Sequence, residues 1–370
     1  MAKSEVFLAD MRALPKRNLE AKVRSLLARA GFDGLDLAKK FVAIKIHFGE
    51  PGNLAFIRPN YAALVAQMVR DAGGKPFLTD TNSLYTGSRA NAVDHLAAAA
   101  SNGFNSLTVG CEVMIADGLK GIDYREIEVD QKHTDVAKIG SCIADADAII
   151  TLNHFKGHEL TGIGGAVKNL GMGCAARGGK LYLHSSSKPR IDVNKCVACG
   201  TCVESCSQAA IFFNTAKRAE IDYDKCVGCG QCIAMCQYGA ASAVFNESAS
   251  NAAEKIAEYA LAVLKGKPAV HASFITDVSP FCDCWGYNDM AIVADIGFAA
   301  SSDPVALDRA CTDLVNDAPV NGGSMIDGRG LKPGDDKFSS VHPNTSWRAG
   351  LAYAESIGLG SQSYEIVKVD

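Results

Sequence analysis

Eight of the 14 cysteines in this chain of 370 residues lie between positions 196 and 236, and this cluster constrains the fold more than any other feature. They form two copies of the pattern CxxCxxCxxxC, 30 residues apart, and each copy follows Ile-Asp-x-x-Lys. The first copy is Cys196, Cys199, Cys202 and Cys206, and the second is Cys226, Cys229, Cys232 and Cys236. Cytosolic proteins seldom keep disulfides, so such a dense group of thiols predicts bound metal.

The spacing within each copy predicts which thiols share a metal cluster. Three cysteines separated by two residues can surround one corner of an iron–sulfur cubane, whereas the fourth cysteine of the run points away from it. In bacterial two-cluster ferredoxins that fourth thiolate binds the other cluster. We therefore predict two [4Fe–4S] clusters, the first held by Cys196, Cys199, Cys202 and Cys236. The second is expected on Cys226, Cys229, Cys232 and Cys206.

Zinc is the alternative occupant of such a thiol cluster. Zinc sites usually combine two cysteines with a distant second pair, and they do not need a repeated set of eight. Gly200, Gly228 and Gly230 also suit a backbone that passes close to an inorganic core and offers N–H groups to its sulfurs. Ser207 and Gln237 replace the proline that commonly follows the fourth cysteine, so turn geometry and potential are expected to differ from the usual ferredoxin.

Outside the cysteine block, helix-like and strand-like segments alternate, which is typical of an α/β domain with a mostly parallel sheet and helices on both faces. Strands are expected at 41–48, 76–80, 269–278 and 290–298, helices at 61–71, 90–100, 251–265 and 304–315, and a helix-to-strand passage over 136–152. Asp303 is the expected N-cap of the last helix, with Pro304 at its first position.

The simplest architecture is one α/β domain built from two stretches of the chain. Residues 1–187 form its first part and residues 245–370 its second part. A small α+β ferredoxin-like module with two [4Fe–4S] clusters, residues 188–244, is expected as an insertion between them. Two domains in tandem are the alternative.

Charge and hydropathy exclude several other classes of protein. The formal net charge is −4 and the pI about 6.1, which argues against nucleic-acid and membrane-surface binding, since both usually need a basic excess. No apolar run approaches the roughly 18 residues that span a bilayer. The first residues carry no export signal, so we expect a cytoplasmic protein. The oligomeric state is left open.

Two strand-like segments end in the same Lys-x-His pattern. Lys45 and His47 follow the first, and Lys156 and His158 follow the apolar run at 149–152. Ligands of parallel α/β sheets bind beyond the carboxyl ends of the strands, where these side chains are expected to lie. Lysines can hold a carboxylate or phosphate and histidines can transfer protons, so all four are candidate catalytic residues. The alternative is that they are solvated or packed.

The glycine-rich stretch 161–169 offers a second candidate. It fails the Walker pattern, which needs glycine at Val167 and serine or threonine at Asn169, and the dinucleotide pattern also fails at Val167. A glycine turn with Lys168 and Asn169 can still bind an anion through backbone N–H groups, whereas a tight packed turn is the alternative.

Other polar and thiol residues extend the candidate site. Asp80, Asn82, Tyr85 and Arg89 could add acid, amide and guanidinium groups at another strand end, although turn chemistry explains Asp80 and Asn82 equally well. Cys282 and Cys284 could hold a third metal or form a redox pair, but two thiols alone are incomplete ligation. The remaining cysteines belong to no motif and are expected to be small buried residues: Cys111, Cys142, Cys174 and Cys311.

Several of these segments together resemble one known family, the uncharacterised iron–sulfur-centre proteins of domain of unknown function 362. The resemblance covers nearly the whole chain and rests on residues 45–50, 153–158, 164–171, 282–285 and 302–308. Many members of that family are similar to this chain in having an inserted two-cluster ferredoxin module. The resemblance implies the architecture and favours the Lys-x-His positions as site residues, but it supplies no reaction.

Three functions are compatible with these features. The leading hypothesis is an iron–sulfur oxidoreductase in which the ferredoxin module supplies low-potential electrons to an anionic small molecule at the α/β domain. The second is a pure electron carrier or assembly factor, whose partner is a redox protein that docks on the α/β domain. The third is a non-redox lyase, racemase or transferase whose clusters are structural. The first hypothesis has Lys45, Lys156 and Lys168 holding the anion, with His47 or His158 moving protons.

Overall fold

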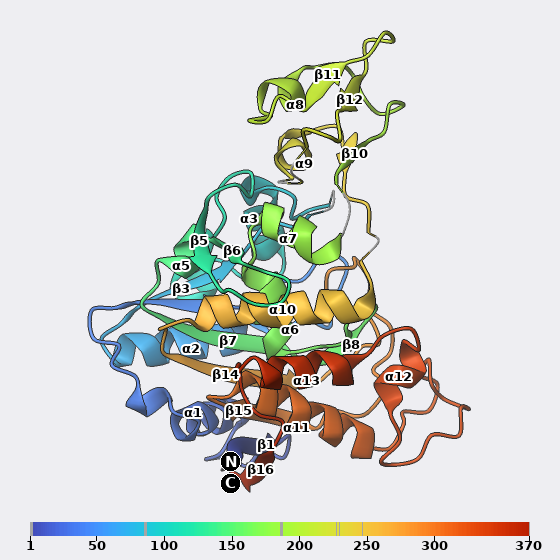
Figure 1. The fold of residues 1–370 in the computed structure, drawn as a ribbon. Coiled ribbons are helices and arrows are strands. Elements are labelled where there is room, and N and C mark those ends of the chain that lie inside the picture. Colours follow the sequence, from blue (N-terminus) through green and yellow to red (C-terminus); the bar gives the residue numbers. More distant parts are fainter. Residues whose placement is uncertain are drawn as a thin grey trace.

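An eight-stranded β-sheet forms the centre of the computed structural model, which describes residues 3–84, 87–185, 188–226, 228, 230–245 and 247–369 (Figure 1). The strand order is β16-β1-β15-β14-β7-β2-β3-β4. Their bounds are β1 Ser4–Asp10, β2 Phe41–Lys45, β3 Lys75–Asp80, β4 Glu112–Ile115, β7 Ala148–His154, β14 Ala269–Ile275, β15 Gly297–Ser301 and β16 Tyr364–Lys368. Only β15 is antiparallel to its neighbours, so the sheet is mixed and mostly parallel.

Helices cover both faces of this sheet, as predicted. One face packs against α1 (Leu19–Arg29), α2 (Pro59–Asp71), α3 (Ala92–Ser101) and α4 (Ser106–Val109). The other packs against α5 (Ser141–Ala144), α6 (Ala166–Cys174), α7 (Arg177–His184), α10 (Ala249–Leu264), α11 (Pro304–Asp317), α12 (Lys337–Val341) and α13 (Trp347–Ser356). Strand β2 contributes to the hydrophobic core on each face of the sheet, because Val42 and Ile44 point to one face and Ala43 to the other. A strand that is buried on both faces has a continuous run of apolar residues in its sequence.

Short elements complete the α/β body. A 3-10 turn, η1, covers Phe32–Gly34, and two hairpins pair β5 (Tyr124–Glu128) with β6 (Val136–Gly140) and β8 (Lys156–His158) with β9 (Gly162–Gly164). The longest helix described, α10, has 16 residues. Among the residues placed by the structure, no helix combines the length and the apolar character needed to cross a bilayer.

Most expected helices and strands are present, but the strand expected at 290–298 is wrong over most of its length. Only β15 forms there, and it begins at Gly297. Ile292 and Val293 are buried outside the sheet, where Val293 makes an isolated bridge to Val320. Their apolar character therefore reflects burial in a loop. The predicted cap of α11 is confirmed, since the Asp303 carboxylate accepts the N–H groups of Val305 and Ala306 at 2.9 and 3.0 Å.

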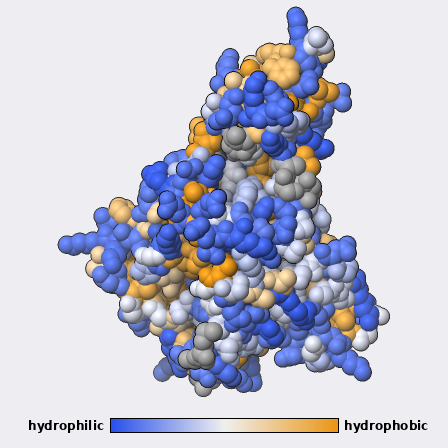
Figure 2. Space-filling model, viewed as in Figure 1, coloured by the Kyte–Doolittle hydropathy of each residue, from blue (hydrophilic) through white to orange (hydrophobic). Residues whose placement is uncertain are grey.

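Residues 188–245, here called the cysteine segment, project from the α/β body (Figure 1). Two short hairpin sheets pair β10 (Arg190–Ile191) with β13 (Ala241–Ser242) and β11 (Ile211–Phe213) with β12 (Ala219–Ile221). Helices α8 (Thr201–Glu204) and α9 (Gln231–Met235) lie beside them. The segment has a small apolar core, to which Leu84 and Leu181 of the body also belong. Figure 2 shows further hydrophobic side chains on its surface. Phe212 and Phe213 are exposed residues of this segment.

The sequence repeat of the cysteine segment is also a repeat of backbone conformation. Asp192 donates its N–H to Ala240, and Asp222, 30 residues later, donates its N–H to Ala210, 30 residues before Ala240. Left-handed φ angles recur at the same spacing, at 82° and 75° for Gly200 and Gly230, 57° and 70° for Ala198 and Gly228, and 47° and 62° for Ala209 and Gly239. Each half therefore pairs with the other in the same way, which is the pattern of an approximate two-fold axis.

Candidate functional site

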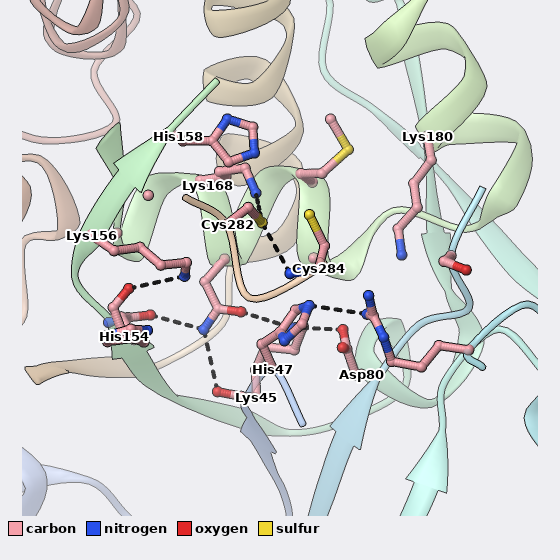
Figure 3. Close-up of a pocket in the computed structure, with 18 of the residues that line it drawn as sticks. Lys45, His47, Asp80, His154, Lys156, His158, Lys168, Lys180, Cys282 and Cys284 are labelled. Carbon is pink, nitrogen blue, oxygen red and sulfur yellow. Dashed lines mark hydrogen bonds and ion pairs between the residues drawn. The ribbon is translucent and has the colours of Figure 1, made fainter. Parts of the chain in front are cut away.

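A pocket opens beyond the carboxyl ends of β2, β3 and β7 (Figure 3). This is where ligands bind in parallel α/β sheets. The structure brings both Lys-x-His pairs and the helix α6 candidates to its wall: Lys45, His47, Lys156, His158, Lys168 and Asn169. Asp80, Arg89, Cys282 and Cys284 line the same pocket. Of the other polar residues expected there, Asn82 is buried beside Asp117, and Tyr85 lies outside the described residues.

A buried ion pair lies at the base of the pocket. The Lys45 ammonium is 3.0 Å from Asp80 Oδ1 and donates to Asn169 Oδ1 at 2.6 Å. Burial alone would raise the pKa of Asp80, but the charge of Lys45, with His47 and Lys180, holds it below its ordinary value. Neither side chain of the pair is more than 3% exposed. Lys45 therefore carries a fixed positive charge that is partly neutralised by Asp80.

Asn169 organises this corner rather than facing a ligand. Its Nδ2 group donates to Asn153 Oδ1 at 2.8 Å and to the carbonyl of Leu152 at 3.1 Å, while Oδ1 accepts from Lys45. Both ends of the amide are thus occupied within the protein. The expectation that Asn169 binds an anion changes accordingly, because its contacts are those of a residue that positions Lys45.

A second charged group forms around Asp283, which the sequence did not single out as a site residue. His154 Nδ1 lies 2.8 Å and the Lys156 ammonium 3.1 Å from Asp283 Oδ2. Burial opposes ionisation of Asp283, but His154 and Lys156 hold its pKa below the ordinary value. Burial likewise opposes the charge on Lys156, yet Asp283 raises the pKa of that lysine. The two pairs, Lys45–Asp80 and Lys156–Asp283, give the pocket two anchored ammonium groups.

His47 lies between two hydrogen-bond donors. The N–H of Gly49 is 3.0 Å from Nδ1, and the guanidinium of Arg89, which can only donate, is 3.0 Å from Nε2. Burial and the Arg89 charge lower the pKa of His47 to about 3. A group with so low a pKa is a poor base at neutral pH. The geometry thus favours binding over the predicted proton transfer for His47.

His158, Lys168 and the two cysteines meet at the opposite wall of the pocket. The Lys168 ammonium lies 3.8 Å from Cys282 Sγ, and the Cys284 N–H donates to the same sulfur at 3.4 Å. His158 Nδ1 accepts the N–H groups of Leu160 and Thr161 at 3.1 and 3.3 Å. Burial and the charge of Lys168 lower the pKa of His158. Ligand atoms of His158, Cys282 and Cys284 all lie within 4.8 Å of one another.

Helix α7 contributes two residues that sequence reasoning missed. Lys180 is buried, and its ammonium donates to the carbonyls of Thr81 and Asn82 at 3.0 and 2.7 Å. Burial lowers its pKa to about 8. His184 lines the same wall, and burial together with Lys168 lowers its pKa to about 3. Neither residue follows a strand or belongs to a motif, so no local signal marks them.

The glycine turn before α6 is filled by a carboxyl group of the protein itself. The carboxylate of Asp308 on α11 accepts the N–H groups of Ala166 and Val167 at 2.6 and 2.9 Å. A Cβ on Gly165 would lie 2.2 Å from Asp308 Oδ1, which explains why glycine is required there. Burial raises the pKa of Asp308 to about 7. The predicted anion-binding turn is therefore occupied by Asp308, and Lys168 points into the pocket instead.

Two smaller cavities lie inside the cysteine segment, and each gathers thiols from both copies of the motif. The first is lined by Cys196, Cys199, Cys202 and Cys236. The second is lined by Cys206, Cys226 and Cys232. Cys229, the fourth predicted member of the second set, lies outside the described residues. Each cavity therefore gathers described thiols from both copies of the motif, and the ligand sets stay a prediction.

The cysteines without a motif are buried as expected, with one exception. Cys111, Cys174 and Cys311 are buried, whereas Cys142 is half-buried. Burial raises the pKa of all four thiols. They are therefore protonated and inert at neutral pH.

Comparisons with known proteins place the chain in one family. Residues 42–313 match the family described as Domain of unknown function (DUF362). Thylakoid-associated protein sll1697 from Synechocystis sp. is 31% identical over 134 residues, which are 36% of this chain and 38% of that protein. The lactate racemase apoprotein from Thermoanaerobacterium thermosaccharolyticum superposes with a TM-score of 0.45 at 13% identity, over 85% of this chain and 58% of the other. A crystal structure of a Thermotoga maritima protein superposes with a TM-score of 0.34 at 10% identity, over 71% of this chain and 52% of the other.

Proposed function

The chain belongs to the DUF362 family, whose description names no reaction, and we propose that this member is an iron–sulfur oxidoreductase. Residues 188–244 form a ferredoxin-like module, and residues 1–187 and 245–370 form an α/β domain whose pocket binds an anionic small molecule. The module holds two [4Fe–4S] clusters, which when bound supply one-electron transfer at low potential. A redox partner protein replenishes the electrons.

The two thiol sets fit iron–sulfur clusters. The described thiols of each set line one cavity, and the two cavities belong to halves of the segment that are related by its approximate two-fold repeat. Backbone N–H groups point at ligand sulfurs, from Ala219 to Cys196 at 3.4 Å and from Ala210 to Cys206 at 3.3 Å. Burial, and then the neighbouring Cys236 and Cys196, raise the pKa of Cys202. A cationic iron–sulfur core would offset that repulsion.

The main support for this proposal is the position of helix α7, which contacts Gly230 beside the second thiol cavity and also lines the pocket. A Cβ on Gly230, which lines the second thiol cavity, would lie 3.2 Å from Leu181 Cδ2 and 3.5 Å from Gly178 Cα. Leu181 belongs to the core of the cysteine segment, whereas Lys180 and His184 line the pocket. Helix α7 therefore links the region beside a predicted cluster site to the candidate substrate site.

The charge of the pocket supports an anionic substrate. Its described lining includes five cationic side chains, Lys45, Arg89, Lys156, Lys168 and Lys180. Three of them are paired with carboxylates, Lys45 with Asp80, Arg89 with Glu50 and Lys156 with Asp283. The excess positive charge is therefore carried by Lys168 and Lys180, which can pair with the oxygens of a carboxylate or phosphate. A docking surface for a pure electron carrier has no need of buried charges, which are costly to place.

Anion binding should weaken as pH rises through the pKa of Lys180, about 8. Below that pH Lys180 is cationic and attracts the ligand, and above it the amine is neutral. We expect the affinity for sulfate, whose charge is constant over this range, to fall roughly tenfold between pH 6.5 and 9.5. Calorimetric titration measures the sulfate affinity at each pH.

A variant and a control test whether Lys180 causes this pH dependence. Lys180→Gln should bind sulfate weakly and with a flat pH profile over this range, whereas the exposed control Lys16→Gln should behave as the parent. An equally steep profile in Lys180→Gln would contradict the assignment.

Iron counting tests the proposed clusters and their crossed ligation. Anaerobically purified protein should contain about eight irons and eight sulfides, with coupled EPR signals after dithionite reduction. Cys236→Ser should retain about four irons. Cys199→Ser/Cys236→Ser should also retain about four, because both ligands serve the same cluster, whereas Cys226→Ser/Cys236→Ser should lose nearly all.

Cys142→Ser is the matched control and should keep the full iron content, because this half-buried thiol belongs to neither set. Tightly bound zinc without sulfide would overturn the cluster proposal. Full electron transfer to a partner in Lys45→Ala and His158→Ala, with no anion bound by the parent, would favour the electron carrier over the enzyme.

A further inference from the structure

Cys282 lies at the wall of the main pocket, in the loop that follows β14 (Figure 3). Its side chain is buried, but it is part of the pocket lining, so a small ligand can reach the sulfur. The predicted cluster ligands lie in other cavities. This thiol therefore has no role in the cluster proposal.

Several donors converge on the Cys282 sulfur from different elements. The Cys284 N–H is 3.4 Å away, and the Lys168 ammonium on α6 is 3.8 Å away. The Cys284 thiol makes the largest contribution by donating a hydrogen bond to the Cys282 sulfur, and His158 on β8 donates another. Burial opposes the thiolate, but these donors and the Lys168 charge outweigh it and hold the pKa of Cys282 well below its ordinary value. The remaining titratable groups that interact with it are Lys156, His47 and His184, and the Glu159 carboxylate accepts the Cys282 N–H at 3.4 Å.

The tautomer of His158 argues against a metal ion at this cluster. Its Nδ1 accepts two backbone N–H groups, so the neutral ring carries its proton on Nε2. A histidine that binds metal through Nε2 needs the opposite arrangement, with Nδ1 as the donor. Without His158 only two thiols remain, which is incomplete ligation for zinc. The Nε2–H is instead suited to donate to a thiolate.

We propose that Cys282 is the nucleophile of this pocket, and that it adds reversibly to the carbonyl carbon of an anionic aldehyde. The proposal rests on the anion-binding part of the proposed function but not on the clusters. The anchored ammonium groups of Lys45 and Lys156 hold the substrate carboxylate or phosphate. His158 and Cys284 are positioning residues, because they act through the sulfur.

The addition step balances within the residues present. The thiolate lone pair of Cys282 forms the C–S bond, and the π pair of the C=O bond moves to oxygen. The Lys168 ammonium, which lies beside the sulfur, gives its proton to that oxygen and becomes a neutral amine. The product is a tetrahedral hemithioacetal with an aldehyde, and the reverse step restores both charges. No oxidant or reductant is consumed.

Alkylation of the holoprotein by iodoacetamide tests the thiolate. Mass spectrometry of the peptide that contains Cys282 should show a rate that is nearly constant from pH 8.5 to pH 6, because only thiolates react. Cys142, whose pKa burial raises, is the internal control and should be unreactive at pH 6. His158→Gln and Lys168→Met should each slow alkylation at pH 6 at least tenfold, with little change at pH 9. Lys168→Arg, which keeps the charge, should restore most of the rate.

A second measurement tests the carbonyl chemistry. Glyoxylate, which combines a carboxylate with an aldehyde, should slow alkylation of Cys282 at least tenfold, and acetaldehyde at the same concentration should slow it much less. An alkylation rate with an inflection near pH 8.5, or stoichiometric zinc that is lost in Cys282→Ser, would overturn the thiolate assignment. If glyoxylate did not slow the alkylation of Cys282, the proposed addition of this thiolate to a carbonyl carbon would be wrong. Sulfate affinity and iron content report the proposed function separately.

Discussion

Lys45→Met lowers the free energy of unfolding by about 3–5 kcal/mol, because it leaves the carboxylate of Asp80 buried without its partner. Lys45 and Asp80 are 1% and 3% exposed, and their charged atoms are 3.0 Å apart. The parent protein keeps Asp80 ionised at an unusually low pKa, whereas burial without Lys45 raises the pKa of this carboxyl above its ordinary value. Denaturant unfolding followed by circular dichroism measures the loss.

The sign of the pH dependence distinguishes this cause from simple loss of packing. In the parent, the Asp80 ion pair stabilises the fold above the unfolded pKa of 3.8 and is lost as the pH falls through the lower folded pKa. In Lys45→Met the folded pKa is the higher one, so stability falls as pH rises through it. The difference between the two proteins should therefore grow from pH 4 to pH 7.

A double variant and a surface control complete the Lys45 experiment. Lys45→Met/Asp80→Asn should recover much of the lost stability, because no charge is left unpaired. Lys40→Met removes a lysine whose ion pair with Asp36 is on the surface, and it should cost less than about 1 kcal/mol. If Lys45→Met lowered the free energy of unfolding as little as Lys40→Met, the Lys45–Asp80 ion pair would not be desolvated.

Gly171→Ala should destabilise the protein by about 2–4 kcal/mol, because helices α6 and α10 touch at this residue. A Cβ on Gly171 would lie 2.0 Å from the carbonyl oxygen of Ile256 and 2.8 Å from its carbonyl carbon, so the backbone of α10 must move. Helix α6 also carries Lys168 and Asn169 into the pocket. Sulfate affinity should therefore fall together with the thermal midpoint.

Gly34→Ala is the matched control for the helix contact. An added Cβ there meets no atom within 4 Å, and the backbone φ is not left-handed. We expect this variant to unfold within about 0.5 kcal/mol of the parent or to be slightly more stable. If Gly171→Ala changed the free energy of unfolding as little as Gly34→Ala, the close approach of α6 and α10 would be refuted.

The parts of the site that sequence could predict are those coupled to strand ends. Lys45, His47, Lys156 and His158 follow apolar runs, and the carboxyl ends of parallel strands meet at one edge of the sheet. The crossed grouping of the cysteines stays a prediction from the CxxCxxCxxxC spacing, and the described thiols line two cavities that are compatible with it.

The parts that sequence could not predict depend on contacts between distant segments. Lys180 reaches the pocket only because α7 packs over the ends of β3, and Asp308 reaches the glycine turn from α11. Asn169 looks like a ligand in a glycine-rich motif, yet its amide is engaged by Lys45 and Asn153. The false strand at 290–298 has the same origin, since burial in a loop selects the same apolar side chains as a strand.

The position of β1 in the sheet sets an order of events during synthesis. This strand, made before its partners, lies between β15 and β16 and pairs with both. At about 5–20 residues per second, on the order of half a minute passes before β15 leaves the ribosome. Through that interval the apolar Val6 and Phe7 have no sheet partner, and the nascent chain exposes an unpaired edge. Chaperone dependence of this protein should therefore concentrate at its first ten residues rather than at the cysteine segment.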